Sequence, residues 1–248
     1  MSRRSHLIWA VAFAFGGAIS LHAAIAADTL QAKGGPITIQ PVNHAALQLK
    51  QGNTVITVDP TPQGGDYATL PKADLILITD IHGDHLNADT IAKASKADTT
   101  VVVPQAVETQ LKKTTDTVIN NGETKTIKGV KIEAVPMYNL TRGPAAGQLF
   151  HTKGRGNGYI VTMGDKRIYI AGDTECTPEM KALKNIDVAF VPMNLPYTMP
   201  PNEAADCVKA FKPKVVYPYH YMGQDLKVFQ SALNGSGVDV RIRDWYAK

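Results

Sequence analysis

Short apolar runs, separated by glycine, proline and polar turn residues, recur along the chain from residue 37 onward. The patterns at residues 37–40, 45–49 and 54–58 predict strands that pair in antiparallel fashion. The run at residues 74–79 is apolar almost throughout, which predicts a buried strand.

Helical segments alternate with further strands in the rest of the chain. Single strands are expected at residues 100–103, 158–163, 167–171, 188–191, 215–217 and 238–242, and residues 124–135 are expected to hold further strands around Lys128-Gly129. Helices are expected at residues 87–96, with Asn87 as the cap, and at 104–112, 178–183, 202–211 and 225–233. The mixture favours two sheets packed face to face with helices outside. Residues 139–157 predict a long loop, rich in glycine and basic residues, of a kind that is often functional.

The first 26 residues have the pattern of a secretory signal peptide. Arg3 and Arg4 precede an apolar stretch at residues 7–19, and the sequence Ala24-Ile25-Ala26 forms a cleavage site. An uncleaved membrane anchor is the alternative, disfavoured because the apolar stretch is short and interrupted by glycine. We expect export to the periplasm or medium, by the Sec route rather than the twin-arginine route that the two arginines also resemble.

The mature chain, residues 27–248, has the length of one mixed domain, and we expect residues 27–36 to form a loose tail. Cleavage would remove two of the 26 basic residues and none of the 22 acidic ones, leaving a slightly positive protein. No basic stripe with interleaved aromatic residues occurs, so no nucleic-acid partner is expected. After cleavage we expect no stable membrane insertion, and the expected partner is a small-molecule substrate.

Two cysteines, Cys176 and Cys207, remain in the mature chain. In an exported protein they either form one disulfide or stay as two buried thiols, and the sequence leaves both alternatives open. Neither is expected to bind a metal.

Four potential metal ligands follow the 74–79 strand within six residues: Asp80, His82, Asp84 and His85. Imidazole and carboxylate groups together suit zinc, with iron or manganese as alternatives. Since the cluster comes directly after a buried strand, it is expected at the edge of a sheet.

This segment resembles the His-x-His-x-Asp-His motif of the metallo-β-lactamase fold superfamily, with Asp80 at the place of the first histidine. Later motifs agree in order: Gly172-Asp173-Thr174 resembles the superfamily's Gly-Asp-Thr, and His220 resembles its late histidine. The resemblance extends from about residue 37 to about residue 243. It implies an α+β fold, a four-layer αββα sandwich with the metal loops at one edge between the sheets.

The resemblance also implies two sets of ligands and one or two bound zinc ions. Asp173 would bridge the two metals, with Asp84, His85 and His220 completing one set. The other set would contain Asp80 and His82. Its usual third histidine is replaced by Asn139, a poor zinc ligand.

His151, further along the same loop, is the candidate for this missing imidazole. A branch of the superfamily carries a similar Tyr-Asn, His-x-Lys-Gly and Gly-Tyr series, which this chain resembles. The alternative is a loop histidine in contact with solvent. Outside the ligand sets, His44 is expected to pack near the metals, and Asp59 either accepts the second N–H of a ligand imidazole or caps a turn.

The sequence therefore predicts an exported metal-dependent hydrolase of the lactonase-like branch. A metal-activated hydroxide would attack a lactone, ester, amide or phosphoester, with Asp84 moving the proton. The alternative is a non-catalytic or mononuclear metal-binding protein on the same fold.

Other loop residues are candidates for binding the substrate. The loop carries three basic residues, Arg142, Lys153 and Arg155. They either favour a substrate with an anionic group or form a basic loop that is simply solvated. Asn194 is a candidate oxyanion donor. Expected lining residues are Tyr197, Thr198, Met199 and Tyr221.

Overall fold

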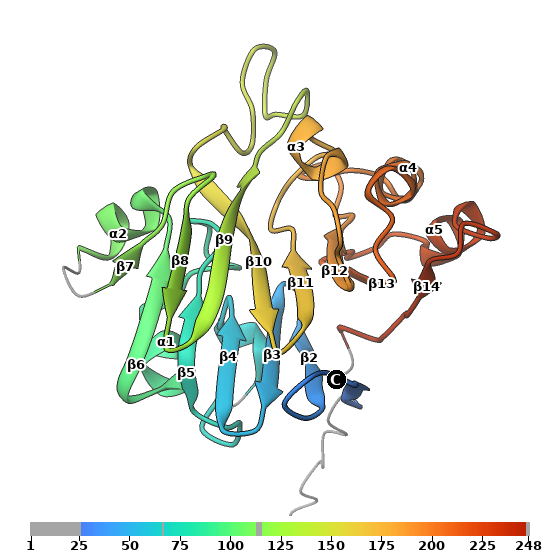
Figure 1. Cartoon of the computed structure of the whole chain (residues 1–248). Coiled ribbons are helices and arrows are strands. Elements are labelled where there is room, and N and C mark those ends of the chain that lie inside the picture. Colours follow the sequence, from blue (N-terminus) through green and yellow to red (C-terminus); the bar gives the residue numbers. More distant parts are fainter. Residues whose placement is uncertain (1–25, 66, 113–115, 247–248) are drawn as a thin grey trace, which may run out of the picture.

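Two seven-stranded sheets face each other in the computed structural model, which describes residues 26–65, 67–112 and 116–246 (Figure 1). The proposed signal peptide lies outside these residues except for Ala26. The first sheet has the order β1-β2-β3-β4-β5-β6-β7 and the second the order β14-β13-β12-β11-β10-β9-β8.

The first sheet is antiparallel from β1 to β4 and parallel from β4 to β7. Its strands are β1 (Asp28–Leu30), β2 (Ile37–Asn43), β3 (Ala46–Gln51), β4 (Thr54–Val58), β5 (Ala73–Leu77), β6 (Ser95–Val103) and β7 (Thr117–Val118). A short 3-10 helix, Pro62–Gly64, follows β4.

The second sheet repeats this division, antiparallel from β8 to β11 and parallel from β11 to β14. Its strands are β8 (Thr124–Ile127), β9 (Val130–Met137), β10 (Gly156–Met163), β11 (Lys166–Ile170), β12 (Val188–Pro192), β13 (Val215–Tyr219) and β14 (Asp239–Val240).

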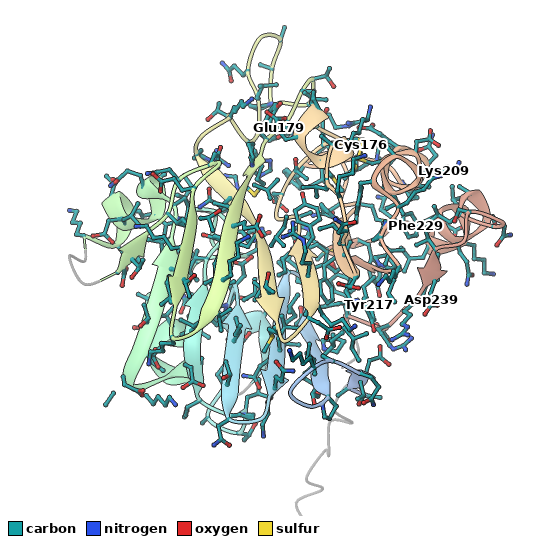
Figure 2. The ribbon with its side chains drawn as sticks, viewed as in Figure 1. Cys176, Glu179, Lys209, Tyr217, Phe229 and Asp239 are labelled. Atoms are coloured by element: carbon teal, nitrogen blue, oxygen red, sulfur yellow. A yellow bond between two sulfur atoms is a disulfide. The ribbon has the colours of Figure 1, made fainter. Side chains whose placement is uncertain are left out.

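The helices cover the outer faces of the two sheets, which confirms the αββα sandwich (Figure 1). On the first sheet lie α1 (Ala88–Ala94) and α2 (Gln105–Leu111). On the second lie α3 (Pro178–Lys181), α4 (Pro201–Phe211) and α5 (Leu226–Ala232), with Phe229 of α5 fully buried (Figure 2). None of the helices in the described ranges combines the length and apolar character needed to cross a membrane.

The apolar run of β5 is continuous because both faces of this strand are buried. Leu75 and Leu77 point into the core between the sheets, whereas Ile76 and Ile78 pack in the cluster beneath α1 and α2. The parallel halves of both sheets thus sit between two apolar layers, and their carboxyl ends come together at one edge.

Most predicted elements are present with shifted ends, and two expectations need correction. The expected loose tail at residues 27–36 contains β1, whose backbone pairs with β2. The helix expected at 87–96 ends at Ala94, and Ser95 already begins β6, which is longer than the expected strand at 100–103. The cap is confirmed, since Asn87 Oδ1 accepts a 2.9 Å hydrogen bond from the backbone N–H of Thr90.

Candidate metal centre

Residues that follow parallel strands supply most of the candidate site. Asp80 comes shortly after β5, Asp173 after β11 and His220 directly after β13. These strand ends belong to both sheets, so the sandwich brings motifs from both halves of the chain together at one edge.

Within the described residues, the seven side chains predicted as ligands form two groups, in each of which one ligand atom per residue lies within 4.8 Å of the others. The first group contains Asp84, His85, Asp173 and His220, and the second contains Asp80, His82 and His151.

Asp173 lies between the two groups. Its Oδ2 is 3.3 Å from His85 Nε2 and 3.2 Å from His151 Nε2, while its Oδ1 is 3.3 Å from His220 Nε2. One carboxylate therefore faces imidazoles of both groups, which is the arrangement that a bridging ligand requires.

Several of these facing atoms are buried without a hydrogen-bond partner. They are His85 Nε2, His151 Nε2, His220 Nε2 and Asp173 Oδ1. Leaving one buried polar group unpaired costs about 1–3 kcal/mol, so a converging set of such groups calls for a ligand. Imidazole nitrogens around a carboxylate match the donor set that zinc, iron and manganese accept, and the residues present therefore fit a metal.

Three residues at or beside the site have left-handed backbone geometry. His44, Asp59 and His220 have φ values of 51°, 44° and 45°, although none is glycine. Non-glycine residues in this region cost about 1–2 kcal/mol each, and such costs cluster at functional sites. Gly172 before Asp173 has φ +66°, and a Cβ there would lie 2.4 Å from Met137 Sδ.

Asp59 makes the contact that the sequence suggested for it. Its Oδ2 lies 2.9 Å from Nδ1 of His85, and its two oxygens also accept hydrogen bonds from the backbone N–H and hydroxyl of Thr79. Because a carboxylate only accepts, Nδ1 of His85 carries a proton, and Nε2 is the ring nitrogen through which a cation would bind.

The electrostatic field at His85 favours a positive charge. Burial disfavours the imidazolium, but the carboxylates of Asp173 and Asp59 outweigh burial and raise the pKa of His85 well above its usual value. Burial alone would raise the pKa of Asp173. The nearby imidazoles of His220 and His85 outweigh burial and hold this pKa well below its usual value. The same field that would hold a proton here would attract a metal cation.

Asn139 stands at the place of the usual histidine and orients His151. Its Oδ1 accepts hydrogen bonds from the backbone N–H and from Nδ1 of His151, each at 2.7 Å. Its Nδ2 donates to Glu175 Oε1 at 3.1 Å and to the carbonyl of Tyr197 at 2.8 Å. His151 is buried, so the alternative of a solvent-exposed loop histidine is wrong.

His44 contacts the candidate ligand Asp84, in agreement with its expected place beside the metals. Its Nε2 is 3.1 Å from Asp84 Oδ2, and its Nδ1 is 2.7 Å from the hydroxyl of Tyr246. The same Asp84 oxygen is 3.4 Å from His220 Nε2. With 32% of its side chain exposed, Asp84 is the member of its group that reaches solvent.

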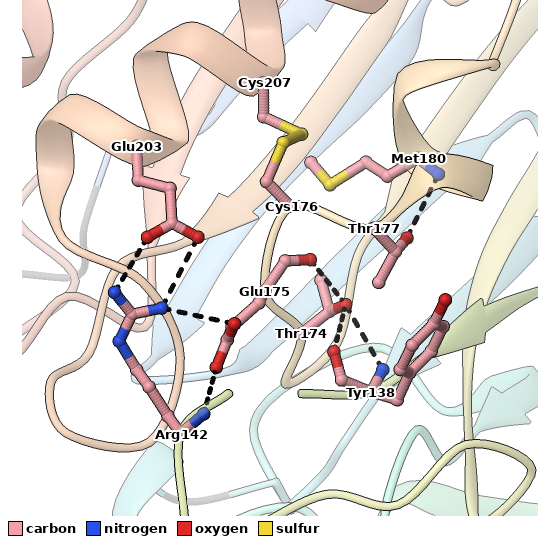
Figure 3. The surroundings of a disulfide bond; sticks show 9 residues. All are labelled: Tyr138, Arg142, Thr174, Glu175, Cys176, Thr177, Met180, Glu203 and Cys207. Carbon is pink, nitrogen blue, oxygen red and sulfur yellow. Dashed lines mark hydrogen bonds and ion pairs between the residues drawn. A yellow bond between two sulfur atoms is a disulfide. The ribbon is translucent and has the colours of Figure 1, made fainter. Parts of the chain in front are cut away.

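The basic residues of the long loop all have acidic partners. Arg142 pairs with Glu203 and Glu175 (Figure 3), Lys153 with Glu179, and Arg155 with Asp80. Their charges are thereby offset, which gives no support to the expected anionic substrate.

Cys176 and Cys207 form a disulfide, which resolves the alternatives that the sequence left open (Figure 3). It joins the segment after Asp173 to α4. Glu175 lies beside it, almost fully buried, and accepts the backbone N–H of Arg142 at 2.8 Å.

Most of the residues expected to line the pocket are buried in the core or hydrogen-bonded to the backbone. Met199 is fully buried in the core beneath α4, which corrects its assignment to the pocket. The Thr198 hydroxyl donates to the carbonyl of Asn194, and the Tyr221 hydroxyl donates to the carbonyl of Arg243. Tyr197 is 45% exposed and packs edge-on against Phe150.

Sequence reasoning missed three residues that support the site: Thr79, Glu175 and Tyr246. Glu175 follows Asp173 by two positions, and this proximity was the available signal for it. For Tyr246, near the end of the chain, no motif was available.

Comparison with known families matches most of this domain. The sequence profile of the family described as "Beta-lactamase superfamily domain" matches residues 38–220. A relative from Thermus thermophilus, described as a metal-dependent hydrolase, is 30% identical over 215 residues, which cover 82% of this chain and 94% of the relative.

Solved structures with the same fold include metal-dependent enzymes. A crystal structure of a candidate metal-dependent hydrolase from Parabacteroides distasonis has a TM-score of 0.84 and 45% identity, covering 89% of this chain and 99% of that chain. CmlA, a diiron β-hydroxylase from Streptomyces venezuelae, has a TM-score of 0.61 and 18% identity, covering 83% of this chain and 52% of that chain. At that identity the likeness to CmlA shows the fold alone.

Proposed function

The chain belongs to the β-lactamase superfamily and is a metal-dependent hydrolase, and on that premise we propose that its two groups of His and Asp side chains bind two zinc ions. The substrate is a small molecule with a lactone, ester, amide or phosphoester bond. The observation that carries the proposal is the set of buried, partnerless atoms around Asp173. It comprises ligand atoms from both groups, as a binuclear centre requires.

A bound metal supplies Lewis acidity, which lowers the pKa of water and polarises the bond to be cleaved. The chain's own residues orient the ligand imidazoles and transfer the proton. Asp59 and Asn139 hold the imidazoles of His85 and His151 with Nε2 toward Asp173. Asp84 is the proton carrier, because its carboxylate both reaches solvent and lies within the first group.

Elemental analysis of the purified protein, beside the variant His151→Ala, tests the centre. Two metals per chain in the wild type and one in the variant are expected. One metal in both proteins would restrict binding to the group of Asp84, His85, Asp173 and His220, and would favour the alternative of a mononuclear or non-catalytic protein. Hydrolysis of a lactone and ester panel that survives unchanged in Asp84→Asn would refute the role of Asp84.

Metal identity is tested by reconstitution. Zinc is the first choice for these imidazole and carboxylate donors. Iron is the main competitor, since CmlA shares the fold and is described as a diiron enzyme. Activity restored to the metal-free protein by Fe²⁺ or Mn²⁺ but not by Zn²⁺ would overturn zinc.

Export forms a separate part of the proposal: residues 1–26 are removed and the hydrolase acts in the periplasm or medium. The disulfide supports it, because disulfides persist in oxidising compartments. Mass spectrometry of the protein from its native cells is expected to find Ala27 at the N-terminus. An N-terminal Met1 on membrane-bound protein would support the anchor instead.

A further inference from the structure

Arg155 occupies both oxygens of the candidate ligand Asp80. Its Nε lies 3.1 Å from Asp80 Oδ1, and its Nη2 lies 3.0 Å from Oδ2. The Asp80 side chain is fully buried, and the Arg155 side chain is 19% exposed. A two-point guanidinium–carboxylate contact of this kind is both strong and directional.

The backbone holds the two residues in this arrangement. Nη1 of Arg155 donates to the carbonyl of Phe150 at 2.8 Å. The next residue, Gly156, approaches so closely that a Cβ would lie 2.7 Å from the carbonyl oxygen of Thr79. Asn157 donates its backbone N–H to that oxygen at 2.9 Å. The start of β10 is thus packed against the segment that carries Asp80, which leaves Arg155 little freedom to move away.

The pair makes the two metal-ligand groups electrically unequal. The first group contains two carboxylates, Asp84 and Asp173, and neither of them contacts an arginine or lysine within the described part of the chain. The second group contains one carboxylate of its own, Asp80, whose charge Arg155 offsets. A divalent cation is therefore attracted more strongly to the first group.

We propose that Arg155 competes with a metal ion for Asp80 and thereby sets the order of metal binding. The group of Asp84, His85, Asp173 and His220 fills first, and the group of Asp80, His82 and His151 fills second with lower affinity. This inference rests on the proposed metal centre. The opposite role, in which Arg155 orients Asp80 as a ligand and strengthens metal binding, is an outcome of the same test.

The test is a titration of the metal-free protein with Zn²⁺ against a chromophoric chelator, with bound metal counted by elemental analysis. The wild type is expected to bind zinc in two steps, the second weaker by about tenfold or more because the metal must displace Arg155 from Asp80. Arg155→Gln frees Asp80 from its charged hydrogen bonds, and is therefore expected to tighten the second step by about 10–100-fold and to leave the first unchanged. Arg155→Lys keeps the charge but loses the two-point contact of the guanidinium group. Its second zinc affinity is expected to lie between those of the wild type and Arg155→Gln.

Lys153→Gln is the matched control, because it removes a positive charge from the same loop. Lys153 pairs with Glu179, which belongs to neither group, so both zinc affinities are expected to stay at their wild-type values. A second step that is unchanged or weaker in Arg155→Gln overturns the competition.

The titration of the wild type alone also tests the proposed order of zinc binding. Two equal steps overturn the proposed order, even if Arg155→Gln fails to fold. A wild type that binds no zinc overturns the zinc centre itself, which separates failure of the proposed function from failure of this inference.

Discussion

Asn139 Oδ1 accepts two hydrogen bonds from His151, one from the backbone N–H and one from Nδ1, both at 2.7 Å. An amide oxygen can only accept, so Nδ1 carries a proton, and Nε2 is the ring nitrogen that faces Asp173 Oδ2, at 3.2 Å. A residue that is itself a poor ligand thus positions the imidazole of the candidate ligand His151.

Removing this amide is expected to weaken metal binding. Asn139→Ala leaves Nδ1 of His151 buried without an acceptor, so the ring loses its fixed orientation, and metal affinity should fall by about 10–100-fold. Metal titration measures the effect, with Asn202→Ala on the exposed face of α4 as the control. Unchanged affinity in Asn139→Ala would show that other contacts suffice to orient His151.

Gly172→Ala is expected to destabilise the protein more than a left-handed conformation alone explains. The new Cβ would lie 2.4 Å from Met137 Sδ, at the position directly before Asp173. Overpacking of this kind costs about 1–3 kcal/mol. Gly223→Ala is the matched control, because Gly223 also has positive φ, +75°, but nothing lies within 4 Å of its Cβ position. Urea unfolding measures both, and equal losses would rule out a packing contribution.

Loss of the disulfide is expected to lower stability. Cys176 and Cys207 are 31 positions apart, and closing a loop of that length stabilises the folded state by about 2–4 kcal/mol. Urea unfolding with and without a reductant measures the difference. The reductant should have no effect on a Cys176→Ala, Cys207→Ala double variant. If the wild type with both thiols titrated as free unfolds at the same urea concentration as the oxidised protein, the prediction is wrong.

Asp28 is expected to make stability depend on pH. Its oxygens accept hydrogen bonds from Arg243 and from the Tyr217 hydroxyl, each at 2.7 Å. Burial alone would raise the pKa of Asp28, but these partners outweigh it and hold the pKa below the usual value. A lowered folded-state pKa means that the carboxylate stabilises the fold above its unfolded pKa of about 3.9, and that this contribution is lost as the pH falls through the folded value.

The variant Asp28→Asn should therefore be less stable than the wild type by about 1 kcal/mol at neutral pH. The difference should shrink as the pH falls below about 4. Asp206→Asn on α4, where the side chain is 73% exposed, serves as the control and should change little. A difference for Asp28→Asn that remains constant from neutral pH into the acidic range would contradict the linkage.

Local spacing in the sequence was enough to predict the residue types of the candidate site. Asp80, His82, Asp84 and His85 follow one buried strand, so their proximity depends on a few consecutive backbone angles. The apolar pattern of strands and helices likewise predicted the layers, because burial on one or two faces leaves a periodic trace in the sequence.

Contacts between distant segments were decided by the tertiary structure. Arg155 reaches Asp80 across 75 positions, and Cys176 meets Cys207 across 31. Pairings of this kind depend on how the two sheets pack and on which strand ends meet, and no local pattern records that geometry. The sequence by itself therefore determined which chemical groups this protein has available, and only the packing of the sandwich decided which of them Arg155 neutralises and which remain free to bind a cation.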